Sequence, residues 1–218
     1  MQTLDEYIEQ HIAAEPPHLR EVYRRTHLHC LYPRMCSGHV QGRLLVMLTR
    51  MINPSRIIEL GSYTGYSSMC MAEGMPHGAQ LHTIEADDEM EEMLRSNIAL
   101  SPRASDIQVH IGDALTVLPS IGETWDMAFI DANKRHYTAY IEALLPRMRP
   151  GGYIIADNTL WGGKIIDDAH NHDAQSRGIM AFNDMVARHP RLETVIIPLR
   201  DGMTLMRVKD DSTTSTNG

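Results

Sequence analysis

Apolar positions along this chain switch repeatedly between a strand-like and a helix-like spacing. Short apolar runs bounded by turn residues predict five β-strands, at 56–60, 80–85, 107–111, 125–130 and 152–156. Stretches with a helical period separate most of these strands, near 65–75, 88–100 and 136–147. Strands that alternate with helices pair in parallel through right-handed crossovers, so the pattern predicts a doubly wound α/β sheet.

Both ends of the chain depart from this alternation. Helical periodicity at 3–14, 17–30 and 41–52 predicts an N-terminal group of helices within residues 1–52. After the fifth strand, "LETVIIPL", "RDG" and "MTLMRV" predict two strands joined by an Asp-Gly turn, which is typical of an antiparallel hairpin. We therefore expect a mostly parallel, seven-stranded sheet with one antiparallel strand from this C-terminal hairpin.

The same pattern predicts how the chain is divided. Neither a linker nor an internal repeat is visible, so residues 1–209 are expected to form a single domain, with its α/β core at 56–208. The final stretch, 210–218, is polar and lacks apolar residues that could anchor it, which predicts a disordered tail.

Composition and charge narrow the range of partners. The chain has 218 residues and a formal net charge of −8, which argues against a nucleic-acid partner, because phosphate contacts need a clustered basic surface. No apolar run approaches the ~20 residues of a membrane helix, and the acidic start "MQTLDEYIEQHIAAEPP" does not resemble a signal peptide. Cys30, Cys36 and Cys70 form no C-x-x-C pair and are expected to be reduced thiols. These observations predict a soluble, cytoplasmic protein without a membrane partner.

The first predicted strand runs into a turn with two glycines, in "IIELGSYTGYSS". A dinucleotide-binding turn that begins at Gly61 needs a second glycine where this chain has Tyr63, so a diphosphate is disfavoured. What remains is the pattern E-x-G-x-x-x-G, made by Glu59, Gly61 and Gly65. Ser67 then opens a helix, whose N-terminus can hold an anion such as an amino-acid carboxylate.

Acidic residues follow the second and third predicted strands. Glu85 comes 20 positions after Gly65, where an acid can accept hydrogen bonds from both hydroxyls of a ribose. Asp113, in "GDA", could reach an adenine amino group. A carboxylate, a ribose and an adenine without phosphates together describe S-adenosylmethionine. Singly, each feature also has a structural explanation: a tight turn for the glycines, a solvated strand end for Glu85 and a helix N-cap for Asp113.

Oxygen ligands end the fourth and fifth predicted strands. Asp131 is followed by Lys134 in "WDMAFIDANKRHY", and Asp157 and Asn158 stand in "GGYIIADNTLWGG", 26 residues after Asp131. One crossover helix fits this interval, so the two strand ends should be neighbours. Oxygen ligands without a thiol or imidazole suit a hard divalent cation, Mg²⁺ first, with Mn²⁺ or Ca²⁺ as alternatives. An Asx-turn and a helix cap would also explain the acids, but not Lys134 and Trp161.

Taken together, the ordered motifs resemble the metal-dependent class I O-methyltransferases, which include caffeoyl-coenzyme A and catechol O-methyltransferases. The likeness is carried by "IIELGSYTGYSS", "HTIEAD", "GDA", "FIDANKRHY", "GGYIIADNTLWGGKI" and "IIPLRDGMTLMRV", over roughly 57–208, and more weakly by "RMCSGHVQGRLL". It implies a Rossmann-like methyltransferase fold and methyl transfer from S-adenosylmethionine to a hydroxyl of a small, catechol-type aromatic acceptor. We also expect a homodimer.

The resemblance also implies roles for individual residues. The metal ligands would be Asp131, Asp157 and Asn158, and the catalytic residues Lys134, as general base, and Asp131. The residues expected around S-adenosylmethionine are Ser37, Glu59, Gly61, Tyr63, Ser67, Glu85, Asp113 and Asp131. Trp161 and Lys134 would face the acceptor. The chain departs from the family at Asn133, where many relatives have an aspartate, and in the loop "DDAHNHDAQSRG", so the preferred acceptor stays open.

Two other classes of protein fit the sequence less well. An NAD-dependent oxidoreductase on a similar sheet is disfavoured by Tyr63 and by the carboxylate pair. A non-catalytic protein that binds S-adenosylmethionine is disfavoured because binding alone needs neither a metal site nor a base. A vicinal diol suits the proposed chemistry, since a cation lowers the pKa of a phenol from its ordinary ~10 and both oxygens can chelate it.

Overall fold

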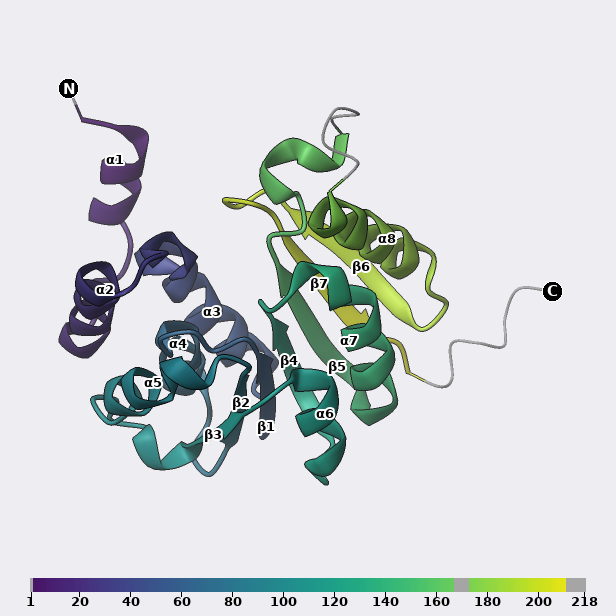
Figure 1. The fold of residues 1–218 in the computed structure, drawn as a ribbon, viewed down its shortest axis with the longest axis horizontal. Coiled ribbons are helices and arrows are strands. Elements are labelled where there is room, and N and C mark those ends of the chain that lie inside the picture. The colour runs from purple at the N-terminus through teal and green to yellow at the C-terminus, as the bar shows by residue number, and fades with distance from the viewer. Residues whose placement is uncertain (1, 167–172, 211–218) are drawn as a thin grey trace.

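The computed structural model describes residues 2–166 and 173–210. They form a seven-stranded sheet in the order β3-β2-β1-β4-β5-β7-β6 (Figure 1). The strands are β1 (Arg56–Leu60), β2 (Gln80–Glu85), β3 (Ile107–Ile111), β4 (Trp125–Ile130), β5 (Met148–Asp157), β6 (Leu192–Ile197) and β7 (Met203–Val208). The pairings from β3 to β5 are parallel, and β7 is antiparallel to both β5 and β6. This confirms the predicted mostly parallel α/β sheet with one antiparallel strand from a C-terminal hairpin.

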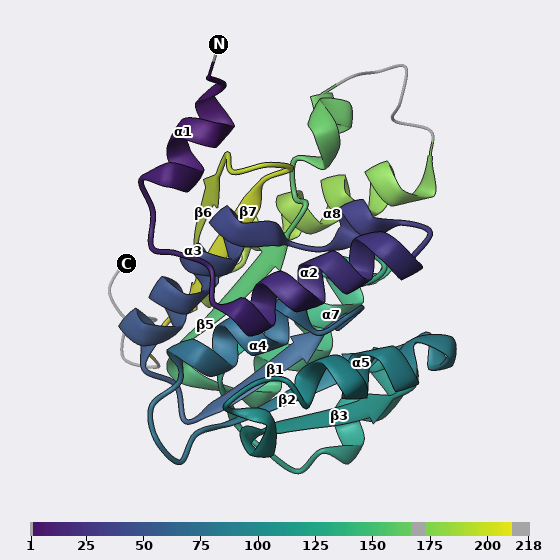
Figure 2. The same cartoon turned by 90° about the vertical axis from the view of Figure 1, so that its left-hand side faces the viewer.

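Helices cover both faces of the sheet (Figures 1 and 2). One face carries α2 (Pro17–His29), α3 (Gly38–Ile52), α4 (Tyr66–Gly74) and α5 (Glu91–Ile98). The other face carries α6 (Ala114–Val117), α7 (Tyr137–Leu144) and α8 (Ala174–Arg188). The first helix, α1 (Leu4–Gln10), has no buried residue. None of the described helices is long and apolar enough to cross a membrane.

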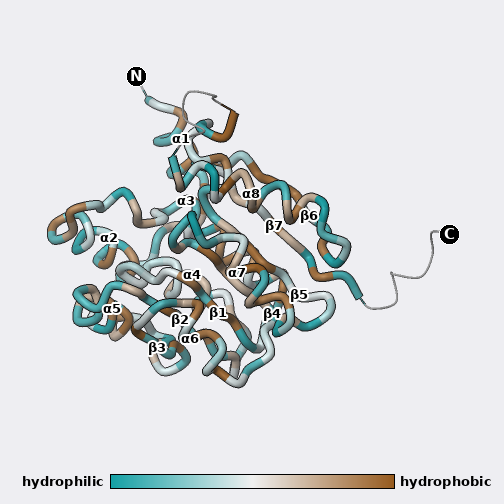
Figure 3. Tube along the Cα trace, turned by 45° about the vertical axis from the view of Figure 1, so that its right-hand side comes forward, coloured by the Kyte–Doolittle hydropathy of each residue, from teal (hydrophilic) through white to brown (hydrophobic). Residues whose placement is uncertain are grey.

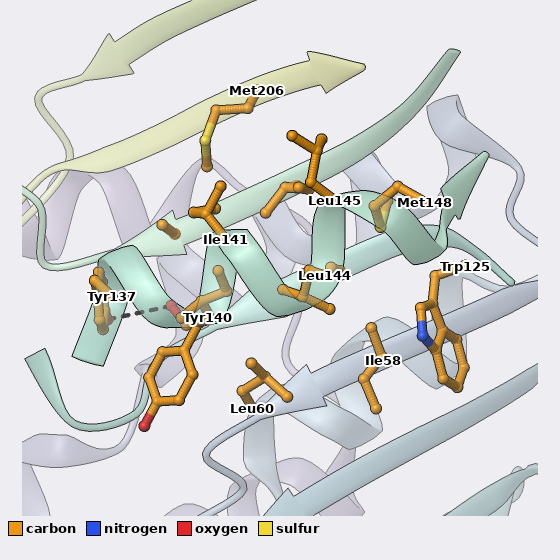
Figure 4. Close-up of a cluster of buried hydrophobic side chains, with 14 of the residues drawn as sticks. Ile58, Leu60, Trp125, Tyr137, Tyr140, Ile141, Leu144, Leu145, Met148 and Met206 are labelled. Carbon is orange, nitrogen blue, oxygen red and sulfur yellow. Dashed lines mark hydrogen bonds between the residues drawn. The ribbon is translucent and has the colours of Figure 1, made fainter. Parts of the chain in front are cut away.

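The central strands are apolar on both sides because both sides are covered. On β1, Ile57 joins the buried cluster beneath α2–α5, whereas its neighbour Ile58 joins the cluster beneath α6–α8. Figure 4 shows Ile58 in this second cluster together with Leu144 of α7 and Trp125 of β4. Along the chain trace, brown apolar segments recur on the central strands, while the surrounding helices and loops alternate between brown and teal (Figure 3). Such strands read as short, continuous apolar runs, which is the pattern the sequence shows.

Several elements differ from the sequence-based prediction. The helices α6 and α8 were not predicted, and the stretch 88–100 divides into a 3₁₀ turn at Asp88–Met90 and α5. The strands of the hairpin are joined by the five residues 198–202, a longer connection than a tight Asp-Gly turn. Cys30, Cys36 and Cys70 are free thiols, as predicted. Of the predicted tail, only Asp210 lies within the described residues, and part of the loop expected to shape acceptor preference, 167–172, also lies outside them.

Candidate active site

Backbone hydrogen bonds continue the parallel pairing just past the strands and bring their carboxyl ends together. Gly61 N donates to Ile84 O at 2.9 Å, and Asp131 N donates to Leu60 O at 2.9 Å. Gly112 N donates to Glu85 O at 2.8 Å. The residues that follow β1, β2, β3 and β4 therefore lie side by side at one edge, which is where ligands of parallel sheets bind.

A cavity of about 850 Å³ opens at this edge, a volume within the ordinary range for small-molecule sites. Its walls include all but one of the residues that the sequence predicted for the site, namely Ser37, Gly61, Tyr63, Ser67, Glu85, Asp113, Asp131, Lys134, Asp157, Asn158 and Trp161. The exception is Glu59. Residues from six separate segments of the sequence thus meet around one space.

Glu59 lies beneath the cavity wall and is fully buried. Its carboxylate accepts hydrogen bonds from Ser67 Oγ at 2.5 Å, Thr83 Oγ1 at 2.5 Å and the hydroxyl of Ser68. Burial raises the pKa of Glu59 to about 7, although these three donors oppose the rise. The carboxylate therefore fixes the start of α4 from below.

Close backbone approach explains the first glycine of the turn. Gly61 has φ +93°, and a Cβ there would lie 2.3 Å from the carbonyl oxygen of Asp131, so only glycine fits. Tyr63 also has a positive φ, of 49°. The Glu85 carboxylate accepts hydrogen bonds from the backbone N–H of Tyr63 at 2.6 Å and of Ser62 at 3.1 Å. The turn therefore wraps around the Glu85 carboxylate and packs against the backbone of Asp131.

Two carboxylates and one ammonium group meet at the ends of β4 and β5. Lys134 Nζ lies 2.6 Å from Asp131 Oδ1. Asp157 is only 4% exposed, and burial together with the nearby Asp131 raises its pKa to about 6. Asn158 N donates to Asp157 Oδ1 at 2.8 Å, and Asn158 itself takes a left-handed conformation with φ 58°. The charges leave this corner net negative, an environment that favours a bound cation.

The donor chemistry here suits a hard cation. No three His, Cys, Asp or Glu side chains of the described residues gather as a metal site. The predicted ligands are instead two carboxylates, Asp131 and Asp157, and one carboxamide, Asn158. Each Asp157 oxygen accepts one hydrogen bond, from Gln41 Nε2 or Asn158 N, which leaves lone pairs for a metal ion. These oxygens are the ligand types that Mg²⁺, Mn²⁺ and Ca²⁺ prefer, so the residues fit the predicted metal.

Two aromatic rings lie near the ammonium group of Lys134. Its Nζ lies 5.3 Å from the centre of the Tyr137 ring and 6.0 Å from that of the Trp161 ring. Trp161 Nε1 and Gln175 Oε1 are buried and have no hydrogen-bond partner among the described residues. Trp161 and Gln175 both line the cavity, so residues of its wall carry one donor and one acceptor without a partner among the described residues.

Asp113 has the structural role that the sequence left open for it. Its Oδ1 accepts hydrogen bonds from Leu115 N at 2.9 Å and Thr116 N at 3.2 Å, so it is the N-cap of α6. Asp113 also lines the cavity. Its helix-capping role does not conflict with the predicted contact with adenine, which stays a prediction.

Sequence reasoning missed several residues that support the site. Gln41 Nε2 donates to Asp157 Oδ2 at 2.5 Å. The Tyr137 hydroxyl donates to the carbonyls of Asp157 at 3.0 Å and of Ile130 at 3.3 Å, and so ties the ends of β5 and β4 together. Asn97 Nδ2 of α5 donates to Thr64 O in the glycine turn at 3.0 Å. Gln41 and Tyr137 stand within the quoted stretches "RMCSGHVQGRLL" and "FIDANKRHY", and Asn97 lies outside them, but no local spacing indicates the contacts that these side chains make.

Comparison with known proteins identifies the family. The profile of the O-methyltransferase family matches residues 9–209. The chain belongs to the O-methyltransferase family. It is 34% identical over 186 residues to a catechol O-methyltransferase of Niastella koreensis, covering 81% of this chain and 84% of that protein. It is 33% identical over 207 residues to a caffeoyl-CoA O-methyltransferase of Mesembryanthemum crystallinum, covering 88% of this chain and 80% of that protein.

Solved structures of O-methyltransferases agree with this assignment. The O-methyltransferase of Bacillus cereus, in complex with S-adenosylhomocysteine (SAH), superposes with a TM-score of 0.89 at 30% identity and covers 94% of this chain and 97% of its own. The resemblance drawn from the sequence motifs is therefore confirmed, as is the predicted class of enzyme.

Proposed function

We propose that this O-methyltransferase transfers the methyl group of S-adenosylmethionine to one hydroxyl of a catechol, with a divalent cation at Asp131, Asp157 and Asn158. Mg²⁺ is the first choice, and Mn²⁺ and Ca²⁺ are alternatives. The observation that carries the proposal is the pair of carboxylates beside Lys134, within the cavity at the strand ends. The predicted homodimer and cytoplasmic location stay predictions.

The cofactor proposal is supported by the shape and chemistry of the glycine turn. The Glu85 carboxylate accepts hydrogen bonds from the backbone N–H groups of Ser62 and Tyr63 at Oε2 and of Asp87 at Oε1, which leaves Oε1 a lone pair for a ribose hydroxyl. Tyr63 fills the position that a diphosphate would need. When bound, S-adenosylmethionine supplies a sulfonium that is already a good leaving group, so the protein has mainly to position the acceptor. The related protein of Bacillus cereus was solved with SAH.

Lys134 is proposed as the general base. In its neutral form Nζ would accept the proton of the reacting hydroxyl, and the adjacent Asp131 carboxylate holds it in place. Lys134 is buried, with the rings of Tyr137 and Trp161 near its Nζ, which limits the access of water to this amine. A divalent cation at this site would lower the pKa of the phenol and hold its oxygen.

The number of protein ligands favours a catechol as acceptor. Three ligand residues leave coordination positions of a six-coordinate cation open, and a catechol presents two adjacent oxygens to them. A monophenol presents only one and stays free to rotate. Trp161 lines the cavity, and its flat ring would give the acceptor ring a partner to stack on.

The test combines turnover with direct metal binding. A catechol and its monophenol analogue are compared with labelled S-adenosylmethionine at saturating Mg²⁺, and Mn²⁺ binding is measured by the loss of the free-ion signal in electron paramagnetic resonance. We expect the catechol to be methylated at least tenfold faster, and Asp157→Ala to lose both turnover and Mn²⁺ binding. The exposed variant Asp184→Ala is the control. Equal rates on both acceptors would reject chelation, and full turnover in excess chelator would reject the metal.

A further inference from the structure

We propose that Arg200 and Gln41 are positioning residues for Asp157, so that the β6–β7 loop sets the orientation of this carboxylate. The proposal rests on the function proposed above, because it concerns the same cation site. Arg200 and Gln41 are 159 residues apart in the sequence, and Gln41 and Asp157 are 116 apart. Only the folded protein brings the three together.

Gln41 is the middle member, and both ends of its amide have a defined partner. It is 1% exposed, on the first turn of α3. Its Oε1 accepts a hydrogen bond from Arg200 Nη1 at 2.8 Å, and its Nε2 donates to Asp157 Oδ2 at 2.5 Å. A guanidinium can only donate, so Arg200 selects the amide orientation in which the NH₂ group faces the carboxylate.

Arg200 has a second role at the wall of the cavity. It stands in the connection 198–202 with φ 51°, and its guanidinium also donates to the carbonyls of Ser37, Cys36 and Arg34. This short segment before α3 lines the cavity. The donors of Arg200 are therefore directed at the protein's own backbone and at Gln41. Through these hydrogen bonds Arg200 connects the β6–β7 loop to the cavity wall before α3.

The consequence concerns the direction in which Asp157 presents its oxygens. Asn158 N holds Oδ1 and Gln41 holds Oδ2, so the plane of the carboxylate is set by these two donors. Without Gln41, only the hydrogen bond from Asn158 N restrains rotation of the carboxylate about its Cβ–Cγ bond. Loss of such an outer contact to a metal ligand ordinarily weakens metal affinity by about 10–100-fold.

We call the chain of contacts from Arg200 through Gln41 to Asp157 the relay. Three variants and two matched controls distinguish a loss of this relay from general destabilisation. The variants are Gln41→Leu, Arg200→Ala and the double variant. Arg103→Ala is the control for arginine, because Arg103 also donates to backbone carbonyls, of Met75 and Pro76, and does not line the cavity. Gln108→Leu is the control for glutamine, since Gln108 bonds Gln80 on the exposed edge of the sheet. The probe is Mn²⁺ alone, titrated into each protein and followed by electron paramagnetic resonance.

The relay predicts a specific pattern of affinities. Gln41→Leu should weaken Mn²⁺ binding tenfold or more, Arg200→Ala should weaken it as well, and the double variant should be no weaker than Gln41→Leu, because Arg200 acts through Gln41. Affinity for SAH, measured by calorimetry, should stay within about twofold in Gln41→Leu and fall in Arg200→Ala, which alone releases the segment before α3. Both controls should bind Mn²⁺ and SAH like the unchanged protein.

Each other outcome overturns a different statement. If the unchanged protein binds no Mn²⁺, or Asp157→Ala still binds it, the proposed cation site is wrong and the relay falls with it. If the unchanged protein binds Mn²⁺, Asp157→Ala does not and Gln41→Leu binds normally, only the relay is wrong. Additive losses in the double variant would also reject it. If Gln41→Leu does not fold, Gln41→Asn is used instead, since it keeps the amide but is too short to reach both partners.

Discussion

Replacing Gly61 by alanine should damage the site more than any ordinary substitution in a surface turn. The added Cβ would lie 2.3 Å from the carbonyl oxygen of Asp131 and 2.7 Å from its carbonyl carbon, where ordinary contact begins at 3.4 Å. Since both neighbours are backbone atoms, neither can turn aside. Either the glycine turn or the end of β4 must therefore move, by roughly 1 Å, to relieve the contact.

The size of the effect follows from two separate costs. Positive φ costs a residue with a side chain about 1–2 kcal/mol, and the forced contact adds about 1–3 kcal/mol. Gly78 separates the two costs, because it has φ +82° but nothing within 4 Å of a Cβ. We therefore expect the free energy of unfolding to fall by about 2–5 kcal/mol in Gly61→Ala and by about 1–2 kcal/mol in Gly78→Ala.

Urea unfolding of both variants, followed by calorimetry with SAH, tests this reasoning. A displacement of about 1 Å at positioned groups can lower activity on the order of 100-fold, so the affinity for SAH and the rate should fall in Gly61→Ala and stay unchanged in Gly78→Ala. An equal loss of stability in the two variants, or an affinity of Gly61→Ala for SAH equal to that of the unchanged protein, would contradict the predicted clash with Asp131.

Two further predictions concern the supports of the glycine turn. Because the pKa of Glu59 is about 7 when folded and 4.5 ordinarily, the folded state holds a proton that the unfolded chain has lost, and its stability falls as pH rises from about 4.5 to 7. Glu59→Gln cannot ionise, so its stability should not fall over this pH range. Relative to the unchanged protein, the free energy of unfolding of the variant in urea should be about 2–3 kcal/mol higher at pH 8 than at pH 5. A difference that does not change with pH would disprove this. Asn97→Ala leaves the buried carbonyl of Thr64 without its donor, which should cost about 1–3 kcal/mol and weaken SAH binding, whereas the exposed Ser96→Ala should change neither.

The sequence predicted those parts of the fold that depend on local pattern. The strands β1 to β4 appear within the expected ranges because each is a short apolar run between turn residues. The helix α8 was missed, and Gly178 in its second turn is one reason, since glycine disfavours a helix. The structure explains this residue: a Cβ there would lie 2.4 Å from Lys134 O. The glycine that obscures the helix thus allows it to pack against the turn that carries Lys134.

The same distinction applies to the residues of the site: some could be predicted from the local sequence, and others depend on contacts between distant parts of the chain. Gly61, Glu85, Asp131 and Asp157 could be found because each directly follows or ends a strand, and strand order alone makes them neighbours. Gln41 and Arg200 could not, because their importance depends on contacts across more than 100 residues of sequence. Asp113 shows a third case, in which one residue both caps a helix and lines the cavity.

The strand order β5-β7-β6 has a consequence for how the chain folds. During synthesis β6 leaves the ribosome before β7, yet its partner within the sheet is β7, which separates it from β5. Until β7 enters, β5 is an open edge whose Ile154 and Ile155 are destined to be fully buried. Such an edge is a template for pairing with another chain, so the nascent protein is most prone to aggregate in the interval before its last strand emerges.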